Sequence, residues 1–117
     1  MNNKPLNPNT CTACKTSPPP LTKIETKKLL TQISNWDLSS ETNSIKRVLK
    51  LKNFNQAIEV INQIATLAET ENHHPDILLH NYDELIITLK SHKINGLSLN
   101  DFILAAKIDQ LDILLSN

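Results

Sequence analysis

The chain has 117 residues, 12 of them basic and 12 acidic, so its formal net charge at pH 7 is zero. A balanced charge argues against a partner held mainly by electrostatics, such as a nucleic-acid backbone or an anionic membrane. No apolar run approaches the roughly 20 residues of a membrane span, and a chain of this length predicts one domain with its own core.

The N-terminal segment is polar and contains several prolines. It predicts a flexible arm over residues 1–20, before a single domain over residues 21–117. The arm lacks the apolar core of a signal peptide, which favours a cytoplasmic protein. Cys11 and Cys14 lie in it as Cys-Thr-Ala-Cys. The favoured interpretation is two reduced thiols in a tail, because a zinc site needs four ligands; half a zinc site and a redox pair stay open as alternatives.

The first regular elements predicted are a short helix and two strands. The helix begins at Thr22 or Lys23 and ends at Ile33. Its apolar side consists of Ile24, Leu29, Leu30 and Ile33. Residues 35–38 predict a short strand, and a turn joins it to a second strand over residues 44–52. Apolar and polar residues alternate in that second strand, which predicts one buried face.

Residues 54–71 predict the most regular helix of the chain. Asn53 is suited to be its N-cap, Asn72 ends it, and Pro75 forbids its continuation. Apolar residues recur there at spacings of three and four, which is typical of a helix with one buried face. That predicted face consists of Phe54, Ala57, Ile58, Ile61, Ile64, Ala65 and Ala68.

Two more strands are predicted over residues 77–82 and 85–91, joined near Asp83. Gly96, the only glycine of the chain, follows them. A single glycine predicts a position where the backbone needs positive φ or closely approaches another segment.

The last predicted helix opens at the capping-box sequence Ser98-Leu99-Asn100-Asp101 and extends to about Leu115. It has two apolar stripes on nearly opposite sides. The first consists of Leu99, Phe102, Ile103 and Ala106, and the second of Leu104, Ile108, Leu111 and Leu115. One stripe can face the sheet of the same chain. The other would be exposed in a monomer, so we expect a homo-oligomer with helix–helix contacts.

The predicted order is helix, strand, strand, helix, strand, strand, helix. Strands joined by hairpins give an antiparallel sheet. We therefore expect an α+β fold, a two-layer sandwich of a four-stranded antiparallel sheet with three helices on one face.

The adjacent residues His73 and His74 are the main candidates for chemistry. They lie at an irregular junction between a helix and Pro75, which is the kind of place where two neighbouring rings can face one cleft. Two close imidazoles disfavour double protonation, so one can act as a base and the other as an acid near pH 7. From the pair alone, a surface turn with two solvated histidines is an equally good interpretation.

Metal binding is a weaker alternative for the same residues. The available ligands are His73, His74, His80, His92, Asp76 and Asp101. The sequence has no His-x-x-x-His pair on a helix, and adjacent histidines rarely bind one ion comfortably, so we expect no metal site. Taken singly, His92 is explained by an exposed strand end, Asp101 by helix capping, and His80 by a structural or exposed position.

Several segments together resemble a known family. The strongest is Ala68-Glu69-x-x-Asn72-His73-His74-Pro75-Asp76. Others are Trp36, Leu51-Lys52-Asn53-Phe54, Ser91-His92, Gly96-Leu97-Ser98, Asn100-Asp101-Phe102 and Leu104-Ala105-Ala106-Lys107-Ile108-Asp109, and the Cys11-x-x-Cys14 arm also fits. As a set they resemble the pterin-4a-carbinolamine dehydratase family, in the bacterial form that accompanies phenylalanine hydroxylase.

The resemblance implies an enzyme that dehydrates 4a-hydroxytetrahydrobiopterin to the quinonoid dihydropterin and so supports tetrahydrobiopterin recycling. It implies the same α+β fold, a homodimer or homotetramer, no metal or other cofactor, and a functional link to an aromatic amino acid hydroxylase. Family members also serve as dimerisation partners of transcription regulators. A protein-binding module that uses the last helix is therefore the alternative.

The resemblance also assigns roles to residues. His73 and His74 would be the general acids, His92 the general base, and Asp101 a supporting catalytic residue. The implied substrate-binding residues are Glu69, Pro75, Ser91, Lys93 and Ile94.

The sequence departs from the family pattern in two places. The segment between His74 and His92 is one residue longer, and Ile77 and Leu78 occupy positions where an aromatic residue is common. The extra residue predicts a bulge or a longer hairpin near Asp83. If it instead shifted the last strand by one residue, His92 would turn to the wrong face.

Overall fold

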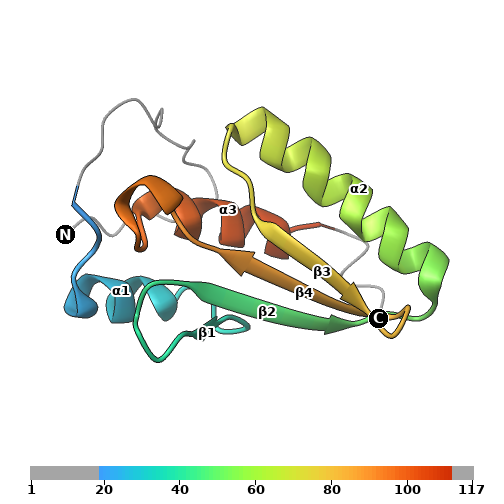
Figure 1. The fold of residues 1–117 in the computed structure, drawn as a ribbon, viewed down its shortest axis with the longest axis horizontal. Coiled ribbons are helices and arrows are strands. Elements are labelled where there is room, and N and C mark those ends of the chain that lie inside the picture. Colours follow the sequence, from blue (N-terminus) through green and yellow to red (C-terminus); the bar gives the residue numbers. More distant parts are fainter. Residues whose placement is uncertain (1–18, 112–117) are drawn as a thin grey trace.

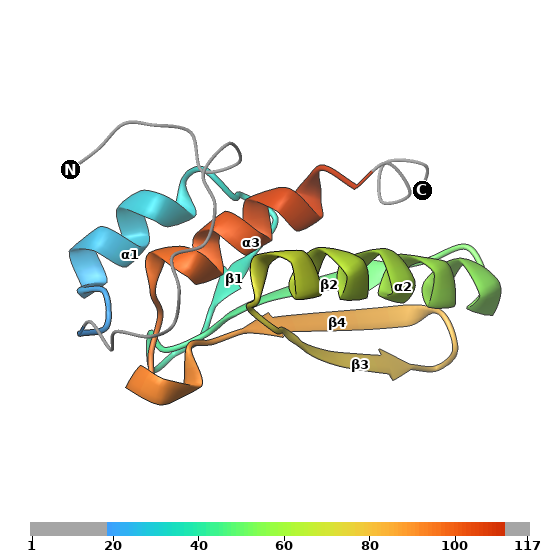
Figure 2. The same cartoon turned by 90° about the horizontal axis from the view of Figure 1, so that it is seen from above.

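A computed structural model describes residues 19–111, and Figure 1 shows its helices and strands. The elements are α1 (Lys23–Leu30), β1 (Asp37–Leu38), β2 (Ile45–Lys50), α2 (Phe54–Glu71), β3 (Asp76–His80), β4 (Glu84–Leu89), the 3-10 helix η1 (His92–Ile94) and α3 (Leu99–Asp109). The strands form one antiparallel sheet in the order β1-β2-β4-β3. Figure 2 shows the three α-helices on one face of this sheet, so the predicted α+β fold is confirmed.

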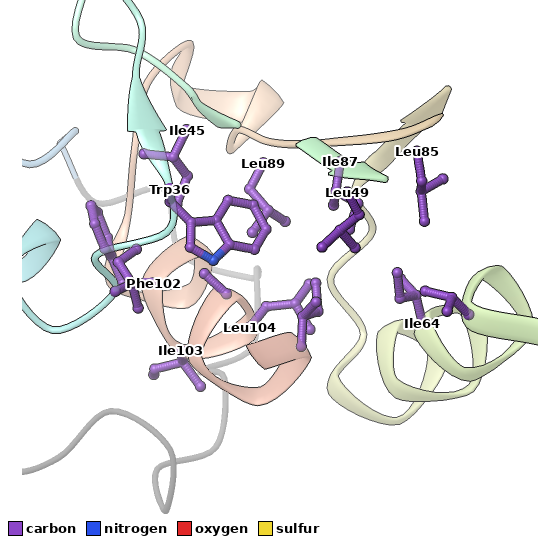
Figure 3. Packing of buried hydrophobic residues seen from close by; sticks show 14 of the residues in the cluster. Trp36, Ile45, Leu49, Ile64, Leu85, Ile87, Leu89, Phe102, Ile103 and Leu104 are labelled. Carbon is purple, nitrogen blue, oxygen red and sulfur yellow. The ribbon is translucent and has the colours of Figure 1, made fainter. Parts of the chain in front are cut away.

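The core lies between the sheet and the helices. The inner face of the sheet presents Ile45, Leu49, Leu85, Ile87 and Leu89, all of them buried. The register places Ile45 opposite Leu89 and Leu49 opposite Leu85, so apolar side chains meet across the strands. Figure 3 shows the helices contributing Ile64, Phe102 and Leu104 to the same cluster.

Helix α2 has the predicted bounds and the predicted caps. The Asn53 side chain accepts a hydrogen bond from the backbone N–H of Gln56 at 2.8 Å. The buried side of the helix follows Ala57, Val60, Ile64 and Ala68. The predicted face was wrong at one edge, because Phe54 and Ile58 are 51% and 38% exposed and Ala65 is exposed as well. They lie to one side of the line of residues that faces the core.

Helix α1 differs from its prediction in two respects. It ends at Leu30, earlier than predicted, and Ile33 is buried in the turn that follows. Ile24 is exposed rather than part of the apolar side, since it lies in the first turn away from the core. At the start of the helix, the Thr22 backbone N–H donates to the Glu25 carboxylate at 2.9 Å, and the Thr22 hydroxyl accepts from the Glu25 backbone N–H at 3.2 Å. Hydrogen bonding by the backbone of Thr22, followed by its side chain, lowers the pKa of Glu25.

The prediction that helix α3 has a second, exposed apolar stripe is wrong. Leu104 and Ile108 are fully buried within this chain, and Leu111 is partly buried against the core. The reason is that α3 lies between α1 and α2, so it is covered on more than one side (Figures 1 and 2). The helix ends at Asp109 rather than near Leu115, which lies outside the described residues. The stripe therefore gives no support to a homo-oligomer.

The β3–β4 hairpin turns at residues 81–83. Asn81 and Tyr82 there both have positive φ, 52° and 56°. Pairing with β4 is continuous over the whole of β3, so the two strands contain no bulge. The Lys50 ammonium donates to Asp83 at 3.2 Å, and this bond, followed by attraction to the Asp83 charge, raises the pKa of Lys50.

Gly96 was predicted to have positive φ or to lie close to another segment, and the second is what the structure shows. Its φ is not positive. A Cβ added there would lie 2.8 Å from the Cβ and 3.2 Å from the Cγ of Pro20. The contact is reinforced one residue on, where the Leu21 N–H donates to the Leu97 carbonyl at 2.8 Å. Glycine is required because the start of the domain packs directly on this loop.

Gly96→Ala is expected to destabilise the protein by about 1–3 kcal/mol, because the added methyl group overpacks against Pro20. Chemical denaturation of both proteins measures the difference. The same substitution in a Pro20→Gly background should cost clearly less, since the opposing ring is gone. An equal cost in both backgrounds would show that this contact is not the reason for the glycine.

None of the helices within residues 19–111 combines the length and the apolar character that crossing a bilayer requires. Most of the predicted arm, including Cys11 and Cys14, lies outside the described residues.

Candidate active site

The two histidines emerge where α2 ends in a left-handed turn. Asn72 adopts φ 52° and ψ 42°, a conformation that asparagine tolerates better than most residues. The N–H of His73 then donates to the Ala68 carbonyl at 3.1 Å. The turn gives the two rings different environments: the His73 side chain is 7% exposed and that of His74 is 58% exposed.

His73 is held by the buried carboxylate of Asp101. Its Nε2 lies 2.6 Å from Oδ1 of Asp101, a residue with no solvent exposure. The other carboxylate oxygen, Oδ2, accepts from the Ser98 backbone N–H at 2.9 Å and from the Ser91 hydroxyl at 2.8 Å. The predicted capping box is confirmed. Asp101 does more than cap α3, because the same carboxylate joins α3 to the end of α2.

His74 is paired with a second carboxylate at the surface. Its Nε2 lies 2.5 Å from Oε2 of Glu69, which belongs to the last turns of α2. Both side chains are largely exposed. The site thus has one buried and one exposed histidine–carboxylate pair.

His92 lies in η1, beyond the end of β4. Ser91 pairs with Gly96 as an isolated antiparallel bridge, which closes the loop that carries His92. The His92 Nε2 is 4.0 Å from Oδ2 of Asp76, two residues after His74, and both side chains are exposed. The loop, rather than strand register, places His92 beside the segment that follows the two histidines.

The remaining predicted residues surround this cluster. Pro75 and Ile94 are half-buried, whereas Lys93 is exposed. The Ser91 hydroxyl points to Asp101, although its residue was predicted to bind substrate. Substrate contact by these four residues stays a prediction. His80 is elsewhere, exposed and 3.1 Å from Glu84 at the hairpin end of β3.

Sequence analysis missed contacts that join helices or distant segments. Ser98 was predicted only as a cap, but its hydroxyl is 2.7 Å from that of Ser91. Lys107 of α3 donates to Glu71, the last residue of α2, at 2.8 Å, and both side chains are mostly buried. This ion pair fastens the end of α2 to α3 just before the histidines. No local pattern identifies it, because its partners are far apart in sequence.

The structure bears on only one of the two alternative metal sites. Cys11 and Cys14 lie outside the described residues. Within residues 19–111, no three or more His, Cys, Asp or Glu side chains are grouped as a metal ion would require. The carboxylates of Asp101 and Glu69 instead each contact one imidazole nitrogen.

A family profile and similar sequences from other organisms all indicate the same family. The profile of a family described as Pterin 4 alpha carbinolamine dehydratase matches residues 19–111. A Methylococcus capsulatus protein is 41% identical over 101 residues, 86% of this chain and 88% of its own. A Halorhodospira halophila protein is 40% identical over 106 residues, 91% of this chain and 96% of its own. Both carry the name "Putative pterin-4-alpha-carbinolamine dehydratase".

Two solved structures are similar in fold. One, from Brucella melitensis and described as a transcriptional coactivator/pterin dehydratase, has a TM-score of 0.73 and 29% identity, and the match covers 81% of this chain and 98% of that chain. The other is described as a pterin dehydratase-like protein and RuBisCO assembly factor in the alpha-carboxysome. Its TM-score is 0.54 with 18% identity, so this likeness concerns the fold alone.

Proposed function

The chain belongs to the pterin 4 alpha carbinolamine dehydratase family, and on that premise we propose that it dehydrates a 4a-hydroxytetrahydropterin to the quinonoid dihydropterin. The observation that carries the proposal is the cluster at the end of α2. Support comes from the buried His73–Asp101 pair, the exposed His74–Glu69 pair, and His92, whose Nε2 is 4.0 Å from Asp76 in the segment after the two histidines.

The reaction needs one acid and one base. The C4a–O bond of the pterin breaks, and the departing hydroxyl takes a proton to leave as water. N5 loses its proton, and the electron pair of that N–H bond forms the C4a=N5 double bond. Nothing is oxidised or reduced, so properly placed proton donors and acceptors are sufficient, and each contributes roughly 10²–10⁴-fold.

His73 and His74 act as the acids in this proposal. Each ring nitrogen Nε2 contacts a carboxylate, at 2.6 Å for His73 and 2.5 Å for His74. A hydrogen-bonded carboxylate orients the ring and leaves its other nitrogen free. The other nitrogen, Nδ1, then delivers the proton to the leaving hydroxyl.

His92 is the base. Its nearest carboxylate, on Asp76, is exposed and 4.0 Å away, beyond the length of a hydrogen bond. Of the three imidazoles, His92 therefore has the longest distance to a carboxylate, and in this proposal its ring accepts the N5 proton. In this proposal Pro75, which follows His74, and Lys93 and Ile94, which follow His92, bind the pterin.

We further propose that the reaction needs no metal ion or separate cofactor, since only protons and water are exchanged. The pterin is the substrate. The family resemblance implies the wider role. We propose that the protein is cytoplasmic and helps to regenerate the tetrahydrobiopterin used by an aromatic amino acid hydroxylase.

A crystal soaked with a dihydropterin tests the site. We expect the bicyclic ring between His73, His74 and His92, with the edge that carries C4a and N5 facing the imidazoles. A pterin bound elsewhere, or a cluster that does not take up the ligand at saturating concentration, would contradict the proposed function.

A protein-binding role is the second candidate, favoured by the likeness to the Brucella melitensis structure described as a coactivator. The predicted surface on the last helix is withdrawn, because Leu104 and Ile108 belong to the core. The exposed apolar side chains of Phe54 and Ile58 on α2 are a better candidate for a protein-binding surface.

We propose that this surface of Phe54 and Ile58 also joins copies of this chain into a dimer or tetramer.

The double variant Phe54→Asp/Ile58→Asp is expected to convert this oligomer to monomer in light-scattering measurements, because two buried charges oppose the contact. Ile24→Asp is the control, since Ile24 is also an exposed apolar residue but lies on α1. A monomeric wild-type protein, or equal dissociation by the control, would refute the proposed surface.

A further inference from the structure

Ser91 lies at the junction between the loop that carries His92 and the buried carboxylate of Asp101. Its backbone N–H donates to the Gly96 carbonyl at 2.8 Å, and its own carbonyl accepts from the Gly96 N–H at 3.4 Å. Its hydroxyl donates to Oδ2 of Asp101 at 2.8 Å. One residue thus fixes the loop and contacts the partner of His73.

Two serine hydroxyls lie beside Oδ2 of Asp101. The Ser91 hydroxyl donates to this oxygen at 2.8 Å, and the Ser98 hydroxyl lies 3.4 Å from it. The two hydroxyl oxygens are 2.7 Å apart, and either of them can be the donor in that contact. Oδ2 also receives the Ser98 backbone N–H at 2.9 Å, so Ser91 and Ser98 together supply its hydrogen bonds.

This arrangement determines how Asp101 meets His73. With Oδ2 supplied by Ser91 and Ser98, the carboxylate turns Oδ1 towards His73 Nε2 at 2.6 Å. A carboxylate only accepts, so Nε2 must carry the hydrogen. The nitrogen that a histidine leaves free is set by the hydrogen bond of the other. Nδ1 of His73 is therefore the nitrogen that exchanges a proton.

We propose that Ser91 is a positioning residue: through Asp101 it holds His73 with its hydrogen on Nε2, and it ties the His92 loop to the same carboxylate. Its hydroxyl acts through Asp101, so a contact of this residue with the pterin would come from its backbone. The catalytic part of this inference rests on the proposed dehydratase function, whereas the placement of the His73 proton does not.

Ser91→Ala tests the inference with two readouts. Nitrogen-15 NMR of the imidazole rings, at a pH where they are neutral, should show a single Nε2–H form of His73 in the wild-type protein and a mixture in the variant. The kcat should fall about tenfold, the lower end for loss of an outer hydrogen-bond partner. KM should change little, because the hydroxyl is directed to Asp101. Ser91→Thr keeps the hydroxyl and should restore both readouts.

Ser39→Ala is the matched control. The Ser39 hydroxyl is also partly buried and bonds the N–H groups of Asn43 and Ser44, both at 3.1 Å, in the turn after β1. Its loss should lower stability without changing kcat or the proton position on His73. If Ser91→Ala does not fold, Ser91→Cys preserves the size with a weak donor and is expected to change the same two readouts.

A single Nε2–H form of His73 together with an unchanged kcat in the Ser91 variant would overturn the inference. The NMR result does not depend on catalysis. If the wild-type protein showed no dehydratase activity, the proposed function would fail, and the spectra alone would decide whether Ser91 controls His73.

Discussion

His74→Ala is expected to lower kcat for carbinolamine dehydration by about 10²-fold or more, because it removes a proton donor from the reacting group. The His74 ring is 58% exposed, so its truncation leaves the core unchanged. Its partner Glu69 is exposed too and remains solvated by water when the ring is gone. The loss of rate should therefore occur in a protein of nearly wild-type stability, measured by thermal unfolding.

His80→Ala is the matched control for this substitution. His80 is also exposed and also lies near a carboxylate, 3.1 Å from Glu84, but at the hairpin end of β3. We expect its kcat to equal that of the wild-type protein. Comparable losses in the two variants would mean that any exposed histidine matters equally, and the assignment of His74 as an acid would be wrong.

Asp101→Asn is expected to lower kcat by about 10–10²-fold, by analogy with the carboxylates that orient metal-bound histidines. The carboxylate accepts on both oxygens, from His73 on one and from Ser91 and Ser98 on the other. An amide offers one oxygen and one NH2 group, so at least one of these donors faces another donor. The buried site should also lose about 1–3 kcal/mol of stability.

Asp109→Asn separates the effect on rate from the effect on stability. Asp109 is at the other end of α3, where its Oδ1 accepts from the Trp36 indole N–H at 2.9 Å and pairs with Arg47. The same change of carboxylate to amide should destabilise the fold there as well. Its kcat, corrected for the folded fraction, should stay at the wild-type value. If both aspartate variants lost rate equally, the role of Asp101 would be structural only.

Features coded by neighbouring residues could be predicted from the sequence. The Asn53 cap, the end of α2 at Asn72 and the capping box from Ser98 to Asp101 each depend on side chains within three or four residues. The alternation in β2 and β4 likewise indicated their buried faces. These local signals were sufficient for the order of elements and for the α+β class.

The errors concern burial that depends on the rest of the fold. Leu104 and Ile108 form an apolar stripe that in isolation resembles an exposed surface, but α3 is covered from both sides. Phe54 and Ile58 fit the helical spacing of α2 and are nevertheless exposed. Spacing identifies an apolar side, whereas the neighbours that cover it are a property of the tertiary structure.

In the candidate site, too, local features could be predicted and tertiary contacts could not. The positions of His73 and His74 at the end of a helix were predictable, and the resemblance indicated Asp101 as a supporting residue and Glu69 as part of the site. The difference in burial between the two rings was not predictable, since it results from the left-handed turn at Asn72. Nor was the bond from Ser91 to Asp101, which joins a loop to a helix across ten residues of sequence.

The central claim is that this chain catalyses loss of water from a pterin carbinolamine. The most direct measurement follows the absorbance of the quinonoid dihydropterin as a freshly formed 4a-hydroxytetrahydropterin decays, with and without the full-length protein. We predict a rate that rises in proportion to protein concentration and is nearly lost in His74→Ala. A decay rate equal to the spontaneous rate at every concentration of folded wild-type protein would contradict it.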